Sequence, residues 1–338
     1  MIDLTEAAYD LDLDDTHWLP TVLRRGLPVL DHGLGVAGWE YGHPPDGGDV
    51  QHRNVHVASG PQDFAERHVR GAAAAPPEVL RLGLRSGRAT TGSQLAKELG
   101  RPDALQIYVS HIGYCKDVLY LAAVNPDGAG VAIIAPLEEI TTLSWNESRQ
   151  WQMLAAHIEA GHRLREGIAL AEEEQGAAGD FPFEAEAILD ARNFRVTDAA
   201  GAARRPTASQ RLREAAVAID RARGRMRNTD PRKALEGWKA LVHGRWSVVD
   251  WFDTDGRRFV LAIPNAPEIT DPRGLTARES QVAWMAAAGM TNKLIAYRLG
   301  LSTSRISLVL RTAMRKLGVR TRTQLAHRIG DFPAPETA

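Results

Sequence analysis

Apolar and polar positions alternate in different ways along the chain, and the changes divide it into three parts. The first part, residues 1–174, opens with a helical pattern over 14–30 and an extended pattern over 36–41. Two β-rich apolar runs, 117–124 and 130–135, flank a Pro-Asp-Gly turn signal and predict a hairpin. The first part is therefore predicted to be a mixed α and β unit.

A long helix closes this first part. Ser144 is followed three residues later by Glu147, which is a capping-box pattern, and helical spacing of apolar residues continues to about residue 174. The segment 175–182 combines small residues, two glycines and a proline, so it predicts a linker.

The second part, residues 183–264, again mixes α and β patterns. It begins with an apolar run at 186–190 and continues through an Arg-rich helical stretch at 210–227. Two strand patterns, 246–252 and 258–263, then flank an Asp-Thr-Asp-Gly turn and predict a second hairpin. No repeat of fixed period relates the first part to the second.

The third part is set apart by its charge. A proline-rich stretch at 265–273 predicts a second linker, residues 274–330 form the third part, and residues 331–338 form a tail. From Leu275 to Gly330 there are ten Lys or Arg residues and one acidic residue, Glu279, which gives a net charge of +9. The whole chain carries −1, so the remainder carries −10. A basic module therefore follows an acidic one, and a basic module suits nucleic acid.

Four short helices are predicted in the third part. Thr276 and Glu279 form a capping box that opens the first helix. The second helix ends at Gly300, the third extends over about 302–317, and the fourth over 321–329. Two short helices joined by a glycine turn have the helix-turn-helix geometry. In the second helix Leu294, Ile295 and Leu299 are expected to face inward.

The third helix is predicted to have one apolar and one basic face. Apolar residues recur at intervals of three and four, which leaves Ser307, Leu308, Arg311 and Arg315 on the surface. An α-helix fits the major groove, where an Arg guanidinium can pair bidentately with guanine and an exposed Leu can touch thymine methyl groups. The inward set is Ile306, Leu310, Ala313, Met314 and Leu317.

Four motifs follow one another through the third part: Leu275-Thr-x-Arg-Glu279, Gly289-x-Thr-Asn-Lys-x-Ile-Ala296, Leu299-Gly-Leu-Ser302 and Lys316-Leu-Gly-Val319-x-Thr-Arg322-Thr-x-Leu325. They resemble the LuxR-type, or GerE-type, helix-turn-helix family of transcription regulators. The related domain of sigma factors shares the opening Thr-x-x-Glu and the Ile-Ala pair but lacks the last motif.

The resemblance implies that the third helix is the recognition helix. Ser307, Leu308 and Arg311 then occupy the positions that meet base edges, and the other basic residues contact phosphate or the groove rim. The sequence departs from the family at Arg305-Ile306, where Thr-Val is usual, and a long cation in place of a hydroxyl changes the geometry of that contact. The predicted DNA-binding set is Lys293, Ser304, Arg305, Ser307, Leu308, Arg311, Arg315 and Lys316.

The same resemblance implies a homodimer that reads inverted repeats. Members of the family commonly pair through the fourth helix, which here offers Thr321, Leu325 and Ile329. The apolar residues of this helix fit an intradomain core equally well, so both placements stay open.

The first two parts resemble sensor domains. Their alternation of strands and helices, with a long helix leading out of each unit, is similar to GAF and PAS domains, with residues 1–174 GAF-like and residues 183–264 PAS-like. The predicted fold class is therefore an α+β sensor-like region of antiparallel sheets with helices, followed by an all-α four-helix domain. The resemblance implies a role in sensing a signal or in dimerisation and names no ligand.

Two other input modules fit the first part poorly. A phosphoacceptor receiver needs an acidic pair after a strand, whereas Asp14 and Asp15 precede a helical stretch. An acyl-homoserine-lactone pocket needs a Trp and a Tyr at another spacing, because Trp39 and Tyr41 lie two apart and share one strand face. Neither module is predicted.

Single features that suggest chemistry have plainer explanations. Gly33–Gly38 matches the dinucleotide fingerprint, but a strand-like segment follows, so a turn into a strand is predicted. His52 and His56 lie four apart without a further ligand, and Cys115 fits a small buried side chain. The sequence therefore predicts no enzyme activity, no cofactor and no metal.

Cysteine content and hydropathy bear on location. One cysteine excludes an intramolecular disulfide, and the chain contains neither a signal-peptide pattern nor an 18-residue apolar run, so a cytoplasmic location without a membrane is predicted. Predicted partners are double-stranded DNA and a second copy, with RNA polymerase and an unidentified small-molecule effector as further candidates. The alternative function is a signal-binding or enzymatic module whose helix-turn-helix serves protein interaction.

Overall fold

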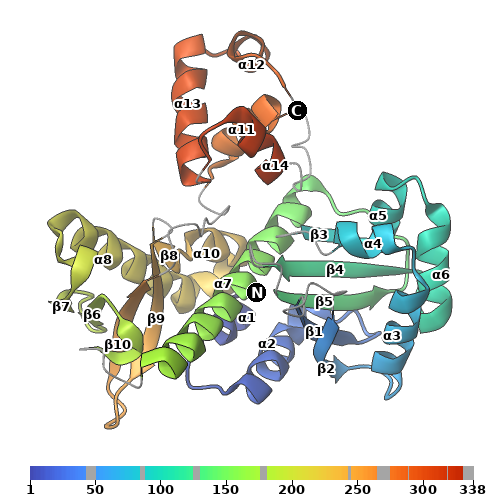
Figure 1. Ribbon diagram of the computed structural model, residues 1–338, viewed down its shortest axis with the longest axis horizontal. Helices are drawn as coiled ribbons and strands as arrows, with labels where there is room; N and C mark the ends of the chain where they lie inside the picture. Colours follow the sequence, from blue (N-terminus) through green and yellow to red (C-terminus); the bar gives the residue numbers. More distant parts are fainter. Residues whose placement is uncertain are drawn as a thin grey trace.

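A computed structural model shows two antiparallel sheets beside a central pair of helices, with a separate helical bundle at one end (Figure 1). This confirms the predicted fold class of an α+β region followed by an all-α domain. Among the described residues, no helix combines the length and apolar character that spanning a membrane requires. The structure describes residues 1–42, 51–83, 88–124, 130–175, 181–242, 245–264, 275–287, 289–317 and 319–329.

The first sheet has five antiparallel strands in the order β2-β1-β5-β4-β3. The predicted hairpin is confirmed, because β4 and β5 pair along their length from Asp117 opposite Leu137 to Val124 opposite Gly130. Its turn, 125–128, lies outside the described residues. The strands are β1 (Val36–Gly42), β2 (Gln51–Ser59), β3 (Arg88–Thr91), β4 (Asp117–Val124) and β5 (Gly130–Leu137).

Helices cover both faces of this sheet. Along β4 the side chains of Leu119 and Leu121 enter one core, and those of Val118 and Ala122 enter another on the opposite face. Every residue of β5 is buried, as expected for a strand covered on both sides. The first core packs against α2 (Asp15–Leu30). The helices after β2 and β3 are α3 (Phe64–Ala74), α4 (Pro77–Gly83), α5 (Gly92–Glu98) and α6 (Pro102–Ile112).

The second sheet has the strand order β7-β6-β10-β9-β8, again antiparallel throughout. The predicted hairpin between β9 and β10 is confirmed, with Phe252 opposite Arg258 next to the turn. The strands are β6 (Ala187–Asp190), β7 (Val196–Ala199), β8 (Leu241–Val242), β9 (Trp246–Phe252) and β10 (Arg258–Pro264). Numbered within each unit, both sheets run 2-1-5-4-3, so they share one topology.

The predicted Arg-rich helix is interrupted in the structure. It forms α8 (Pro206–Arg221), a π-helical turn (Ala222–Met226) and the short α9 (Arg227–Thr229), with Gly224 outside helical backbone angles. The helix α10 (Pro231–Gly237) follows, and its first turn is capped by the side chain of Asp230. Two short 3-10 turns, Pro182–Glu184 and Gly201–Arg204, flank β6 and β7.

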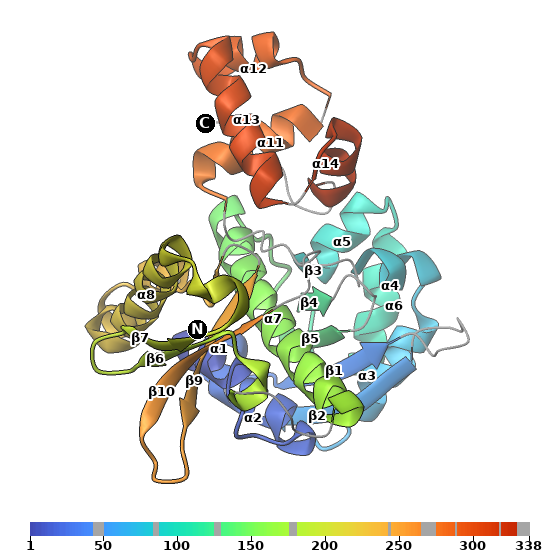
Figure 2. The same cartoon turned by 60° about the vertical axis from the view of Figure 1, so that its left-hand side comes forward.

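Two helices form a layer that both sheets share. The helix α7 (Trp145–Gln175) runs between the sheets (Figure 2) and turns Leu154 and Ile158 to the first core and Met153 and Leu164 to the second. Its predicted capping box is confirmed, since the Ser144 and Glu147 side chains bond each other's backbone N–H groups. The sequence therefore predicts this helix but not its double packing.

The sequence patterns did not predict the first helix, α1 (Ile2–Ala8). It lies beside α7 and also faces both cores, with Leu4 in the first and Ile2 in the second. Its acidic residues pair with the second unit: Glu6 with Arg223 at 3.1 Å, and Asp3 with Arg227. The first helix is thereby tied to Arg223 in the π-helical turn and to Arg227 at the start of α9.

Candidate nucleic-acid interface

The third part folds around its own core. Four helices are present, as predicted: α11 (Ala277–Ala287), α12 (Asn292–Leu299), α13 (Thr303–Lys316) and α14 (Arg322–Ile329). Residues 265–274, which include the predicted linker 265–273, and residues 330–338, which include the predicted tail 331–338, lie outside the described chain. The core consists of Leu275, Val282, Ala283, Met285, Ala286, Ile295, Ala296, Ile306, Val309, Leu310, Ala313, Leu317 and Leu325.

Local sequence signals set the ends of these helices. The predicted capping box is confirmed, because Thr276 N–H donates to Glu279 at 2.7 Å and Glu279 N–H donates to the Thr276 hydroxyl. Thr291 and Ser302 cap α12 and α13 with a single bond each, because their hydroxyls accept from Leu294 N–H and Arg305 N–H. Gly300 ends α12 with φ of 60°, a left-handed conformation that glycine adopts without strain. These caps fix the angle between the two helices of the motif.

The exposed face of α13 carries one continuous stripe. Ser304, Leu308, Arg311 and Arg315 follow one another at intervals of four, three and four residues, so they lie along one side of the helix. All four are exposed, and Leu308 is 50% accessible although it is apolar. We call Ser304, Leu308, Arg311 and Arg315 the recognition stripe. Arg305 is exposed on one flank of this stripe.

The opposite flank of the stripe is held by hydrogen bonds to the neighbouring helix. Ser307 is half-buried, and its hydroxyl accepts a hydrogen bond from the Asn292 amide at 3.0 Å. Arg322 donates to Asn292 Oδ1 and to the Met290 carbonyl, which ties α14 to the same point. Asn292 and Arg322 therefore position α13, a role that sequence reasoning did not assign to either.

Lys316 is engaged inside the domain. Its Nζ lies 2.7 Å from Glu279 Oε2, and the Lys316 side chain is only 34% accessible. Burial raises the pKa of Glu279, but the hydrogen bonds from Lys316 and Thr276 outweigh it and hold that pKa below its usual range. Lys316 thus joins the end of α13 to the start of α11, and its contact with DNA stays a prediction.

The outer face of α12 differs from the sequence prediction. Leu294 was expected to face inward, which is wrong: 45% of its side chain is accessible. Ile295 and Ala296 are buried in the core and Leu299 packs against it, because a helix of eight residues gives its core side to only two or three of them. Tyr297 is 86% accessible and Lys293 is also exposed, so α12 presents a mixed aromatic and basic surface.

The three predicted dimerisation residues are placed differently from one another. Leu325 is fully buried in the domain core, which is one of the two placements that the sequence left open. Thr321 is exposed, and its hydroxyl caps α14 by accepting from Gln324 N–H. The side chain of Ile329 lies outside the described residues. Dimerisation through this helix stays a prediction.

The candidate residues of the first part take the plainer roles. Trp39 and Tyr41 lie in one core on the same face of β1, as predicted. Gly33 and Gly35 have positive φ and lead directly into β1, which confirms the turn into a strand. His56 is half-buried and the side chain of His52 lies outside the described residues. Within the described chain, no group of three metal-ligating side chains gathers.

These features define a helix-turn-helix DNA-binding domain. Residues 273–329 match the family model for bacterial regulatory proteins of the luxR family, also called GerE. This part of the chain is therefore a LuxR-type helix-turn-helix domain, which confirms the resemblance read from its motifs and supports a transcription regulator. The match leaves the GAF-like and PAS-like resemblance of the first two parts as a prediction.

Two wider comparisons complete the picture. No curated protein matches the chain. Among solved structures, it is similar to SdiA from Escherichia coli at 10% identity, over 95% of this chain and 92% of the SdiA chain, with a TM-score of 0.32. So low a score is no basis for transferring any property of SdiA to this protein.

Proposed function

We propose that this protein is a sequence-specific regulator of transcription that inserts α13 into the major groove of double-stranded DNA. The observation that carries the proposal is the recognition stripe. Base readout requires a helix that is held firmly in place and exposes a basic side. The Ser302 cap and the hydrogen bonds to neighbouring helices hold α13, and the side opposite to the stripe lies in the core. The net charge of +9 over Leu275 to Gly330 supplies the attraction to phosphate.

The stripe and its flank are assigned different tasks. Leu308 and Arg311 lie in the middle of the stripe and meet base edges, while Arg305 on one flank and Lys293 on α12 meet phosphate. A base contact carries sequence information, whereas a phosphate contact carries only affinity. The distinction can be tested with two single arginine variants of the same helix.

Selection from random DNA by the purified full chain tests the proposal, and an enriched inverted repeat is the expected result. On that site Arg311→Ala costs about 1–3 kcal/mol and relaxes the choice of base at one position. Arg305→Ala, the matched control, weakens binding to all sequences alike and reduces the slope of affinity against salt by about one. Failure of both the full chain and residues 270–338 to enrich any sequence contradicts the proposal.

The two sheet units supply the input in this proposal, either by sensing a signal or by holding two copies together. Support comes from the contact between them and the DNA-binding domain: the Arg149 guanidinium near the start of α7 donates to the Leu275 carbonyl at 3.2 Å. The N-terminal end of the helix that both sheets share thus contacts the residue at which the DNA-binding domain begins. A conformational change in either unit can therefore reach α11 through α7 and its bond to Leu275.

A further inference from the structure

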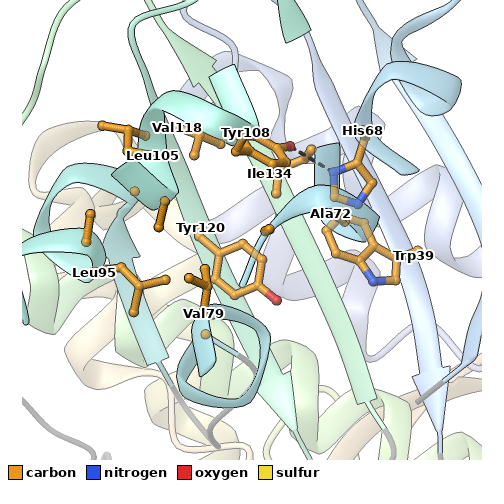
Figure 3. A pocket seen from close by; sticks show the side chains of 15 residues that line it. Trp39, His68, Ala72, Val79, Leu95, Leu105, Tyr108, Val118, Tyr120 and Ile134 are labelled. Atoms are coloured by element: carbon orange, nitrogen blue, oxygen red, sulfur yellow. Dashed lines mark hydrogen bonds between the residues drawn. The ribbon is translucent and has the colours of Figure 1, made fainter. Parts of the chain in front are cut away.

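The first unit contains a cavity of about 70 Å³ on the face of the sheet opposite to α7. It lies between β1, β4 and β5 on one side and the helices α3 to α6 on the other (Figure 3). None of the described residues that line it is Lys, Arg, Asp or Glu. The cavity is therefore a partly open space lined without acidic or basic side chains of these four kinds, and it is distinct from the DNA-binding surface.

One wall of the cavity is aromatic. The rings of Trp39 and His68 are 4.2 Å apart with 35° between their planes, and His68 Nδ1 is 2.8 Å from the Tyr108 hydroxyl. Tyr120 completes this wall, with its ring centroid 6.3 Å from that of Trp39. Aromatic rings attract another ring at face and edge, and such pairs contribute more binding free energy than the apolar area they bury accounts for.

Small residues make the space on the other side. Alanine and glycine line this side of the cavity, where leucine or valine would fill it. They come from the helices α3 to α6 and the residues next to them, including Gly92 where β3 meets α5. An added Cβ at Gly83 would lie only 3.3 Å from the Tyr120 ring. The small residues are Ala72, Ala75, Gly83, Gly92, Ala96 and Ala104.

The volume limits what fits. One water needs roughly 10–15 Å³ of cavity volume, so about 70 Å³ holds about five to seven non-hydrogen atoms. That is the size of one six-membered ring with at most one further atom. A charged group would lose its hydration on entry, and the described lining residues offer no opposite charge to offset that cost.

We propose that this cavity binds a small neutral molecule with a single aromatic ring, and that the ring stacks in the space beside Trp39, His68 and Tyr120. The inference rests on the proposed function only in treating such a molecule as the signal of the regulator. The cavity-lining strands β4 and β5 contact α7 with their other face through Leu121 and Ile133, and α7 reaches Leu275. Occupation of the cavity is thereby connected to the DNA-binding domain.

Binding is tested on the full chain by methyl NMR with phenol as the probe. Phenol is expected to shift the methyl signals of Val118 and Ile134 in the cavity and to leave those of Val248 and Ile263 in the second unit unchanged. Cyclohexanol tests the need for an aromatic ring, and benzoate tests the need for neutrality. Both are expected to bind at least about tenfold more weakly than phenol.

A cavity-filling variant and a surface control test the location. Ala104→Leu on α6 is expected to weaken phenol binding at least about tenfold, while Ser110→Leu on the exposed side of the same helix leaves it unchanged. If Ala104→Leu does not fold, Val118→Ala gives the opposite test, because an enlarged cavity is expected to admit the bicyclic indole. The proposal is overturned if phenol does not shift the signals of Val118 and Ile134, or if cyclohexanol or benzoate binds as tightly as phenol. It is also overturned if a folded Ala104→Leu variant binds phenol with full affinity.

DNA selection by the phenol-free protein separates this inference from the proposed function. Enrichment of a DNA site together with no phenol binding overturns the cavity inference alone. Phenol binding at Val118 and Ile134 without any selected DNA site supports the cavity and contradicts the regulator.

Discussion

The two sheet units share a topology and differ most in the length of one connection. Both have strand order 2-1-5-4-3, yet the chain between the third and fourth strands has 25 residues in the first unit, 92–116, and three in the second, 243–245. The longer connection forms α5 and α6. Six of the fifteen residues that line the cavity come from this segment: Gly92, Leu95, Ala96, Ala104, Leu105 and Tyr108.

The difference teaches where binding capacity arises in such a unit. The common sheet supplies one apolar wall of the cavity, and the inserted helices supply part of the opposite wall and half of the small residues. The second unit lacks the insertion and instead carries an ionic cluster at its shared edge, where Asp250 pairs with Arg223 and, at 3.1 Å, with Arg258. We therefore expect the two units to respond differently to the same class of substitution.

The largest effect is expected from the residue that anchors the insertion. Asp117 is fully buried and accepts hydrogen bonds from Ser93 N–H at 2.9 Å, Ser93 Oγ at 2.6 Å and Thr141 N–H at 3.0 Å. Asp117→Ala leaves these donors buried without an acceptor, so it is expected to cost about 3 kcal/mol or more of unfolding free energy. Denaturant titration measures the loss, and hydrogen exchange should show α5 opening first.

The matched change in the second unit is Asp250→Ala. Its carboxylate is 22% accessible and its arginine partners are also partly exposed, so a loss of about 1 kcal/mol is expected. Equal losses in the two variants would mean that the insertion is not held by Asp117.

The next effect concerns the layer that joins the units. At Gly161 on α7, an added Cβ would lie 2.0 Å from the Ala8 carbonyl oxygen of α1, so Gly161→Ala forces two helix backbones apart. We expect a cost of about 1–3 kcal/mol in a single unfolding transition, because both cores include these helices.

The control for this prediction lies on the same helix. Gly167 is exposed with nothing within 4 Å of an added Cβ, so Gly167→Ala should stabilise by about 0.5–1 kcal/mol through helix propensity. Two separate transitions in Gly161→Ala, each seen by a tryptophan of one unit, would contradict a shared layer.

The smallest effect is chemical. Cys115 lies in the insertion, where burial, and then the charge of Asp117, raise the pKa of its thiol to about 11. Alkylation in mildly alkaline buffer should therefore be about a hundredfold slower than for a free thiol of pKa 9. The same shift stabilises the fold below pH 9, and the contribution is lost as the pH rises through about 11. Ordinary reactivity would mean that the insertion is open in solution.

Local signals predicted much of the fold. The turn residues between β9 and β10, the caps at Ser144, Thr276 and Ser302, and the glycine at 300 each act within a few residues, so the sequence shows them directly. The helix α1 was missed because its seven residues carry no cap bond and owe their burial to α7 and the second unit. The shared topology was missed because no repeated residues accompany it.

The candidate site divides along the same line. The recognition stripe follows from helical spacing alone, so Arg311 and Leu308 were predicted correctly to be exposed. The pairing of Lys316 with Glu279 and the bond between Asn292 and Ser307 join positions 37 and 15 residues apart, which spacing within one helix does not show. The cavity depends on four helices and three strands together, and nothing local marks it.

The placement of α1 and α7 between the sheets limits how this chain can be recombined. A cut within 175–182 looks natural from the sequence, but it would leave Ile2, Met153 and Leu164 facing water on one fragment and strip the other of its cover. Exchange of either sheet unit alone with a relative would meet the same problem. The boundary at which domains of this protein can be exchanged lies instead just before the DNA-binding domain, which has its own hydrophobic core.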